Sequence, residues 1–121
     1  MSGEAFVEAF LKPWNDRDVE GAIAFMTDDC LWEQPRGNEP HGTRFEGRAA
    51  VRAAIEAAFK AVPDIRYELV RSSHGPGLVV VELFVTGTAA DGRPMGFHAC
   101  DVMELRGDRV AAKRSYRKVS A

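Results

Sequence analysis

Apolar residues recur with helical spacing in the first half of the chain. In residues 2–15 they fall three and four positions apart, as on the buried side of an amphipathic helix, at Phe6, Val7, Phe10, Leu11 and Trp14. Ser2 is a suitable N-cap for this helix, and Asp16 or Asp18 can cap a short second helix that carries Ala22, Ile23, Phe25 and Met26. Residues 48–62 repeat the helical spacing, and Pro63 ends that helix.

The remaining segments alternate as strands do. Residues 30–34 predict a strand, and residues 35–47, rich in Gly, Pro, Asn and His, predict a loop of the length that is often functional. Strands are then expected at residues 65–72, 78–88, 95–105 and 109–119, separated by turns at residues 75–77, 91–92 and 107–108. Helices followed by a four-stranded antiparallel meander favour an α+β fold.

Composition narrows the function classes. The 121 residues predict one domain over residues 1–121. Sixteen basic and eighteen acidic residues leave a net charge of −2, which offers no electrostatic footprint for nucleic acid. Five bases that cluster late in the chain are expected on a solvated strand and tail, although they could also face an anionic ligand: Arg109, Lys113, Arg114, Arg117 and Lys118.

The sequence also bears on the cellular location of the protein and on the metals and cofactors that it could hold. No apolar run approaches the ~20 residues that span a bilayer, and the N-terminus lacks the regions of a signal peptide. Cys30 and Cys100 fit neither a metal motif nor a disulfide framework, and the three histidines lack ligand spacing. We therefore expect a cytoplasmic protein without membrane contact, metal or cofactor.

Asp101 is the most informative candidate for chemistry. On a strand it shares one face with Met103 and Leu105, so a carboxylate is placed among apolar side chains. Such a group is costly unless it is paired, hydrogen-bonded or protonated, and the protonated form can serve as a general acid near neutral pH. The alternative is a structural carboxylate that backbone amides or a neighbouring base satisfy, and the pattern leaves both open.

Glu82 is the second candidate carboxylate. If Asp91-Gly92 forms a two-residue hairpin turn, Glu82 stands opposite Asp101, beside Phe84. Two facing carboxylates in an apolar setting do not both ionise easily. A base between them, Lys113 or Arg114, would instead form an ion network, and a three-residue turn would move Glu82 to the other face of the sheet.

Several large side chains are candidates for the wall of a small-molecule pocket. They are either pocket lining or plain core, and they comprise Trp14, Trp32, Phe59, Phe84 and Met103. Gln34 could hydrogen-bond a carbonyl or hydroxyl group of a ligand, and Trp32 shares its strand parity. On the last strand, the apolar pattern places Val110, Ala112 and Tyr116 on the inside.

The order of elements and four motifs resemble the nuclear-transport-factor-2-like superfamily, in particular its SnoaL-like polyketide cyclase and ketosteroid isomerase-like branches. The motifs are WNDRDVEGAIAFMTDDC at residues 14–30, WEQP at 32–35, FEGRAAV at 45–51, and Asp101 with its hairpin. The resemblance covers nearly the whole chain and implies a cystatin-like cone, in which three helices close over a curved antiparallel sheet and a pocket opens at one end. It also implies homodimers formed through the sheet, and Lys113 and Ser115 facing inward.

The catalytic residues of the families that the chain resembles are only partly present in it. Ketosteroid isomerases use a base carboxylate before a proline, a tyrosine on the first helix and an acid at the position of Asp101, but here Gln34 precedes Pro35 and Phe10 replaces the tyrosine. An amide cannot abstract a proton, so steroid isomerisation by that route is not expected. The Asp-Arg-Asp set of enzymes resembling limonene epoxide hydrolase is replaced by Leu83, Val85 and Ser115.

Asp101 does match the acid that SnoaL-like cyclases use for aldol ring closure. Two hypotheses follow. The first is a cofactor-independent cyclase, isomerase or dehydratase acting on a small, mostly apolar carbonyl compound, with Asp101 as acid/base, Glu82 adjusting its acidity, and Gln34 and Lys113 binding the substrate. The second is a non-catalytic module of the same fold that binds a small molecule. Either would be a homodimer without nucleic-acid or membrane partners.

Overall fold

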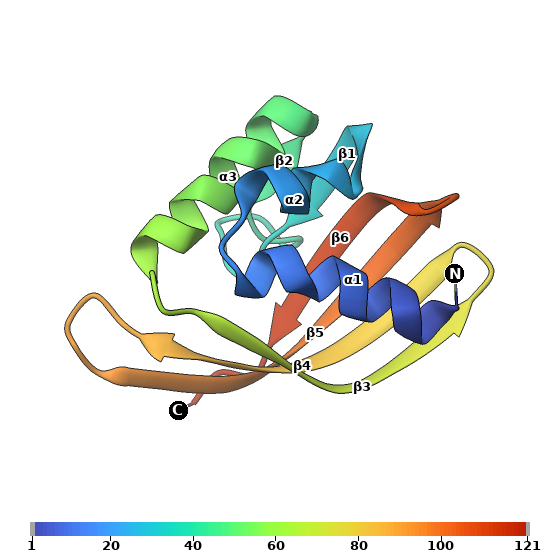
Figure 1. The fold of residues 1–121 in the computed structure, drawn as a ribbon. Helices are drawn as coiled ribbons and strands as arrows, with labels where there is room; N and C mark the ends of the chain where they lie inside the picture. Colours follow the sequence, from blue (N-terminus) through green and yellow to red (C-terminus); the bar gives the residue numbers. More distant parts are fainter. Residues whose placement is uncertain (1, 121) are drawn as a thin grey trace.

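The computed structural model describes residues 2–120, which form three helices and six strands. In chain order these are α1 (Gly3–Asn15), α2 (Val19–Ala24), β1 (Met26–Glu33), β2 (Arg44–Glu46), α3 (Arg48–Ala61), β3 (Arg66–Gly75), β4 (Leu78–Thr88), β5 (Pro94–Arg106) and β6 (Arg109–Arg117). The strands make one curved, unclosed sheet in the order β2-β1-β6-β5-β4-β3, and the helices pack on one of its faces (Figure 1). The predicted α+β cone is confirmed.

The helix starts follow the predicted caps. The Ser2 side chain accepts a hydrogen bond from the Ala5 amide at 3.1 Å, and the Asp18 side chain accepts one from the Gly21 amide at 3.0 Å. The second helix is shorter than expected, because Met26 already belongs to β1, which runs parallel to β6. All other strand pairs are antiparallel.

One strand was not expected. Arg44–Glu46 forms β2 inside the segment predicted to be a loop, and it pairs antiparallel with the end of β1, with Trp32 opposite Phe45. Three residues are too few to display an alternating pattern. The connection between the two strands is closed by hydrogen bonds from the Gln34 amide to the Thr43 carbonyl and from the Thr43 amide to the Arg36 carbonyl.

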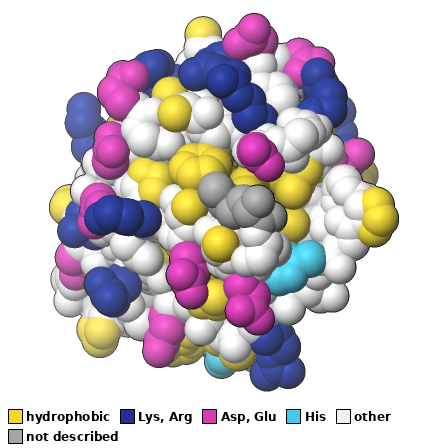
Figure 2. Space-filling view, turned by 45° about the vertical axis from the view of Figure 1, so that its right-hand side comes forward, with side chains coloured by type: hydrophobic (Ala, Val, Ile, Leu, Met, Phe, Trp, Pro, Cys, Tyr) yellow, Lys and Arg dark blue, Asp and Glu magenta, His cyan; other side chains and the backbone are white. Residues whose placement is uncertain are grey.

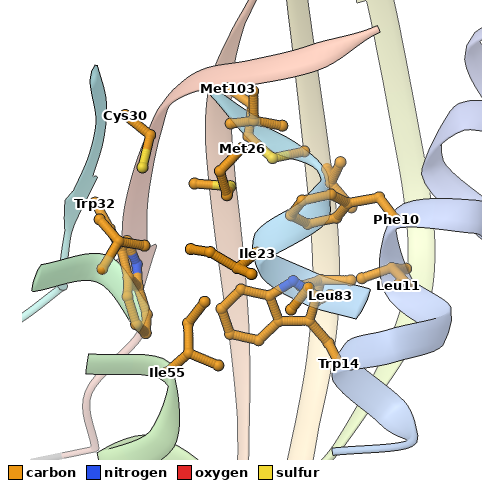
Figure 3. Close-up of a cluster of buried hydrophobic side chains, with 14 of the residues drawn as sticks. Phe10, Leu11, Trp14, Ile23, Met26, Cys30, Trp32, Ile55, Leu83 and Met103 are labelled. Atoms are coloured by element: carbon orange, nitrogen blue, oxygen red, sulfur yellow. The ribbon is translucent and has the colours of Figure 1, made fainter. Parts of the chain in front are cut away.

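The core lies between the helices and the sheet (Figure 3). Trp14 on α1 and Trp32 on β1 meet edge to face, with ring centroids 5.5 Å apart. Met26 and Met103 are fully buried in the same cluster. Each large apolar side chain buried in this way contributes about 1.5–3 kcal/mol relative to exposure, so this cluster holds the helical layer on the sheet.

The β4–β5 hairpin does not have the predicted two-residue turn. The Gly92 amide donates to the Ala89 carbonyl at 2.9 Å, the Ala89 amide donates to the Arg93 carbonyl at 2.8 Å, and Gly92 has φ of +86°. This pattern is a type I turn followed by a left-handed glycine, which makes a three-residue loop. The extra residue shifts the register of the whole hairpin by one position.

The shift corrects two predictions. Asp101 stands opposite Val81, and Glu82 stands opposite Cys100 on the outer face of the sheet, so the expected facing of Glu82 and Asp101 was wrong. Glu82 instead pairs with Arg71 at 3.3 Å. Phe84 also lies on the outer face, where its ring packs on His98 with centroids 5.0 Å apart, and it does not contribute to an inner wall.

The facing of β6 changes along the strand. Leu105 pairs with Val110, whereas Glu104 pairs with Ala112, so Ala111 is an extra residue in a β-bulge. Val110 faces the core before the bulge and Lys113 faces it afterwards, followed by Ser115 and Arg117 at alternate positions. The expectation from the family is met after the bulge by Lys113 and Ser115, and the apolar pattern is correct for Val110 before it. The apolar pattern was wrong for Ala112, which lies on the outer face opposite Glu104, and for Tyr116, which is 58% exposed.

Charged side chains of both signs are interspersed over the face shown in Figure 2, around a central group of apolar side chains. Within the described residues, no helix has the length and apolar character needed to cross a membrane.

Candidate functional site

A cavity of about 240 Å³ lies on the inner side of the sheet, next to the aromatic core. Its walls are mainly apolar and come from three neighbouring strands and the end of α3, with contributions from Ala58, Ile65, Tyr67, Leu83, Val85, Phe97 and Ala99. Trp32, Gln34, Asp101, Lys113 and Ser115 supply polar groups, and Pro35, Arg36, Tyr116 and Arg117 complete the lining. A largely apolar cavity with a few convergent polar groups is the usual form of a small-molecule site.

Asp101 projects from β5 into this cavity and is only 6% exposed. The Ser115 hydroxyl on the adjacent strand β6 donates to Asp101 Oδ1 at 2.6 Å. Ser115 Oγ in turn accepts hydrogen bonds from Trp32 Nε1 and from Lys113 Nζ, both at 3.1 Å. One donated and two accepted bonds use the full capacity of a hydroxyl group, so Ser115 fixes the orientation of Asp101.

The second oxygen of Asp101 is less constrained. Oδ2 is approached by Lys113 Nζ at 3.6 Å, which is longer than a hydrogen bond, and no hydrogen bond to Oδ2 comes from residues 2–120. No guanidinium group clamps this carboxylate in that part of the chain. One edge of a buried carboxylate is therefore available to a molecule in the cavity.

Lys113 is the buried cation of the site. Its Nζ lies 4.6 Å from the Trp14 ring centroid and 4.5 Å from that of Trp32, which is cation–π geometry. Burial lowers the pKa of Lys113, and the negative charge of Asp101 opposes that effect. The two indole rings and Asp101 thus stabilise an ammonium group that is otherwise removed from water.

Tyr67 on β3 brings a phenol to the same wall. Burial raises the pKa of Tyr67, and the charge of Asp101 raises it further. The hydroxyl group is therefore protonated at neutral pH and can act only as a neutral hydrogen-bond donor or acceptor. Its ring packs edge to face on Trp14 with centroids 5.8 Å apart.

The cavity brings together some of the predicted site residues. Asp101, Lys113, Trp32 and Gln34 line it, whereas Trp14, Phe59 and Met103 are buried core residues outside the lining. The lining residues that sequence reasoning missed include Arg36, Tyr67, Phe97 and Ala99, whereas Arg117 was among the late bases that could face an anionic ligand. Phe97 and Ala99 share the strand parity of Asp101, which is the signal that could have identified them.

No metal site accompanies this cavity in the described part of the chain, where no three His, Cys, Asp or Glu side chains are placed to hold an ion. The polar groups of the cavity are instead one carboxylate, one ammonium, one hydroxyl, one amide, one indole N–H, two phenols and two guanidinium groups. Such a set can transfer a proton and can stabilise negative charge on a carbonyl oxygen.

Comparison with known proteins identifies the family. The SnoaL-like domain family matches residues 7–113, and the chain therefore belongs to it. None of the curated proteins compared with the chain matches it in sequence.

Solved structures share the fold over almost the whole chain. The chain is similar to an uncharacterized cystatin-fold protein from Novosphingobium aromaticivorans, with 25% identity, a TM-score of 0.78, and coverage of 98% of this chain and 99% of that one. It is also similar to TerC, co-crystallised with polyporic acid, with 18% identity, a TM-score of 0.82, and coverage of 96% and 91%. A third similar structure is a hypothetical protein with a ketosteroid isomerase-like fold from Catenulispora acidiphila, in complex with trimethylamine, with 13% identity, a TM-score of 0.83, and coverage of 95% and 86%.

Proposed function

We propose that this protein is a cofactor-independent acid/base enzyme that acts on a small, mostly apolar carbonyl compound. The observation that carries the proposal is a buried carboxylate, Asp101, which lines a largely apolar cavity, is oriented by a hydrogen bond from Ser115 to Oδ1, and accepts no hydrogen bond at Oδ2 from residues 2–120. A positioned acid/base group of this kind contributes about 10²–10⁴-fold to the rate of a proton transfer.

The proposed reaction begins with removal of a proton from the carbon next to the carbonyl group. The C–H bond breaks, its electron pair moves to the carbonyl oxygen to give an enolate, and Asp101 Oδ2 takes the proton. Lys113 and the Tyr67 hydroxyl are the donors available to the enolate oxygen, since both belong to the cavity wall. Donors that the protein already holds in place stabilise such charge with little reorganisation.

The enolate then has two outcomes that need no other reactant. Its carbon can attack a second carbonyl group of the same molecule, which closes a ring while Asp101 returns the proton to the new alkoxide. Alternatively, where the substrate has a carbon–carbon double bond next to its α-carbon, the enolate extends over that bond. Asp101 then returns the proton to the far carbon, which moves the double bond into conjugation with the carbonyl group. The Gln34 amide lines the cavity and would orient the substrate, because an amide can hydrogen-bond a carbonyl or hydroxyl group but cannot act as a base.

A binding module without catalysis is the second candidate. The observation that favours it is that Ser115, Lys113 and Asp101 already interact with one another within the chain. The complex of TerC with polyporic acid supports either candidate, because a protein of this fold was crystallised with an organic compound.

We also propose that the protein is a homodimer that associates through the outer face of the sheet. Half-buried apolar side chains of neighbouring strands, Val80 and Val102, lie opposite each other there, and Tyr116 is largely exposed. Sedimentation of wild-type protein and of Val102→Glu tests this arrangement. A wild-type dimer that the substitution dissociates is expected, and a wild-type monomer would contradict it.

Deuterium exchange tests the catalytic proposal without knowledge of the natural substrate. The protein is mixed in D₂O with a panel of small aryl ketones, and loss of the α-proton signal is followed by NMR. Wild-type protein should accelerate the exchange, and Asp101→Asn should abolish the acceleration. Glu82→Gln is the matched control, since it removes a carboxylate from the outer face, and it should exchange at the wild-type rate. Acceleration that persists in Asp101→Asn would leave the binding module as the function.

A further inference from the structure

Two guanidinium groups at the edge of the cavity have no carboxylate partner among residues 2–120. They belong to Arg36 and Arg117, and both contribute to the lining of the cavity. Several arginines elsewhere pair with carboxylates, for example Arg44 with Glu33, Arg52 with Glu20, and Arg106 with Asp29. What sets Arg36 and Arg117 apart from other arginines without such a partner is that they line the same cavity.

Arg117 is held in place by the sheet. It is the last residue of β6 and occupies the inward position after Ser115. Its guanidinium group lies over the Phe97 ring, 3.7 Å from the centroid. Burial lowers the pKa of Arg117, and the positive charge of Arg36 lowers it further. Since Arg36 lines the same cavity, two positive charges are gathered there.

Arg36 is presented by a closed loop. Its carbonyl accepts a hydrogen bond from the Thr43 amide at 2.7 Å, which ties the two sides of the connection between β1 and β2 together. Gly42 allows this closure, because its φ is +80° and a Cβ atom there would lie 1.9 Å from the Gln34 carbonyl oxygen. The loop backbone thus keeps Arg36 beside the cavity.

The charge of the lining is unbalanced. Arg36, Lys113 and Arg117 are its cations, and Asp101 is its only carboxylate and already faces Lys113 at 3.6 Å. The chain as a whole carries a net charge of −2, so the excess of positive charge is a local property of this edge. A bound anion would relieve the repulsion, and the planar fork of a guanidinium group is suited to bidentate binding of a carboxylate.

We propose that Arg36 and Arg117 form a carboxylate subsite and that the substrate is an apolar keto acid. This inference rests on the proposed function of the cavity. The carboxylate binds at the edge and the carbonyl group reaches Asp101. Ser115, which bonds Asp101, and Arg117 are alternate residues on β6, and alternate residues on a strand are ~7 Å apart, so a para-substituted benzene ring is a spacer of suitable size between the two substrate groups.

The test uses 4-acetylbenzoate and its neutral analogue 4-acetylbenzamide as probes, with 4-acetylphenyl phosphate as a second anion. Dissociation constants are measured by calorimetry or ligand-observed NMR at low salt. Wild-type protein should bind the carboxylate about tenfold or more tightly than the amide, and also more tightly than the phosphate. The preference should fall as salt is added, because exposed charges are screened.

Substitutions localise the effect. Arg36→Gln and Arg117→Gln should each weaken carboxylate binding about fivefold or more, and the double substitution should remove the preference for the acid over the amide. Arg109→Gln is the matched control, since Arg109 is an exposed arginine on the same strand outside the lining, and it should bind as wild type. Thermal melts confirm that each variant is folded.

Three results would overturn the subsite. They are equal binding of acid and amide by wild-type protein, a preference that survives the double substitution, and tighter binding of the phosphate. Binding is measured without turnover, so it separates this inference from the proposed function. Carboxylate preference without deuterium exchange would refute the enzyme and keep the subsite. Exchange on neutral ketones without carboxylate preference would refute the subsite and keep the enzyme.

Discussion

The substitution Asp101→Asn tests how strongly Asp101 and Lys113 depend on each other. Both side chains are buried, and Lys113 Nζ lies 3.6 Å from Oδ2 of Asp101. At an effective dielectric constant near 20, two unit charges at this distance attract by about 5 kcal/mol. Asparagine keeps an oxygen that can accept from Ser115 but removes the charge that faces Lys113.

The stability that the substitution removes should be smaller than the full electrostatic attraction between Asp101 and Lys113. The Trp14 and Trp32 rings still stabilise the ammonium group of Lys113, and the lysine can also lose its proton. We expect the free energy of unfolding to fall by about 2–4 kcal/mol near neutral pH, because a buried cation is left without its counter-ion. Urea titration measures this fall directly.

The stability of the Asp101→Asn variant should also depend on pH, and the direction follows from the pKa of Lys113. Burial already lowers the pKa of Lys113, and the substitution removes the charge that opposed this shift, so the pKa falls further. Between the lowered pKa of Lys113 in the folded variant and the ordinary lysine pKa of the unfolded chain, the folded variant binds fewer protons than the unfolded chain. Its stability therefore rises with pH in that range. The destabilisation should therefore be larger near neutral pH than at about pH 9.

A double substitution supplies the control. Lys113→Met removes the stranded cation, so Asp101→Asn with Lys113→Met should be more stable than Asp101→Asn alone. A single Asp101→Asn variant that is as stable as wild type at neutral pH, with no change in pH dependence, would refute the coupling between the two groups.

Three further predictions concern single side chains. Ser115→Ala should lower the free energy of unfolding by about 1–3 kcal/mol and slow α-proton exchange, because Trp32 Nε1 and Lys113 lose their shared acceptor; calorimetry and NMR measure the two effects. Gly42→Ala should destabilise the fold by about 3 kcal/mol in urea titration, since a left-handed φ and a clash with Gln34 both oppose a side chain. Tyr67→Phe should slow exchange with an unchanged melting temperature; an unaffected rate would exclude the phenol as a donor.

Sequence patterns predicted the elements because each helix and most strands carry their own local signals. Ser2 and Asp18 cap helices as expected, and turns at Gly77 and Gly107 separate the later strands. These signals depend only on neighbouring residues. Their order predicted an α+β fold with an antiparallel meander, and the family resemblance implied the three helices closed over a curved sheet.

The register between strands could not be predicted from such local signals. The Asp91-Gly92 pair fits both a two-residue and a three-residue loop, and only the hydrogen bonds of Ala89 decide between them. The bulge at Ala111 likewise leaves no mark in the apolar pattern, although it allows Val110 and Lys113 to face the same side. Both features are set by pairing across the sheet.

The lining of the cavity was only partly predictable for the same reason. Asp101, Lys113, Trp32 and Gln34 were identified from their unusual chemistry or from the family pattern. Arg36 lies in a loop whose path depends on long-range closure by Thr43, so no local signal placed it beside the cavity.

The central claim is that Asp101 moves a proton of a carbonyl compound held in the cavity. Asp101 approaches a bound ketone from one wall, so it can reach only one of two enantiotopic α-protons. Propiophenone incubated with the protein in D₂O should therefore gain one deuterium with a single configuration, and Asp101→Asn, kept under conditions where it is folded, should give none. Exchange of both protons at equal rates, or stereoselective exchange that persists in Asp101→Asn, would contradict the claim.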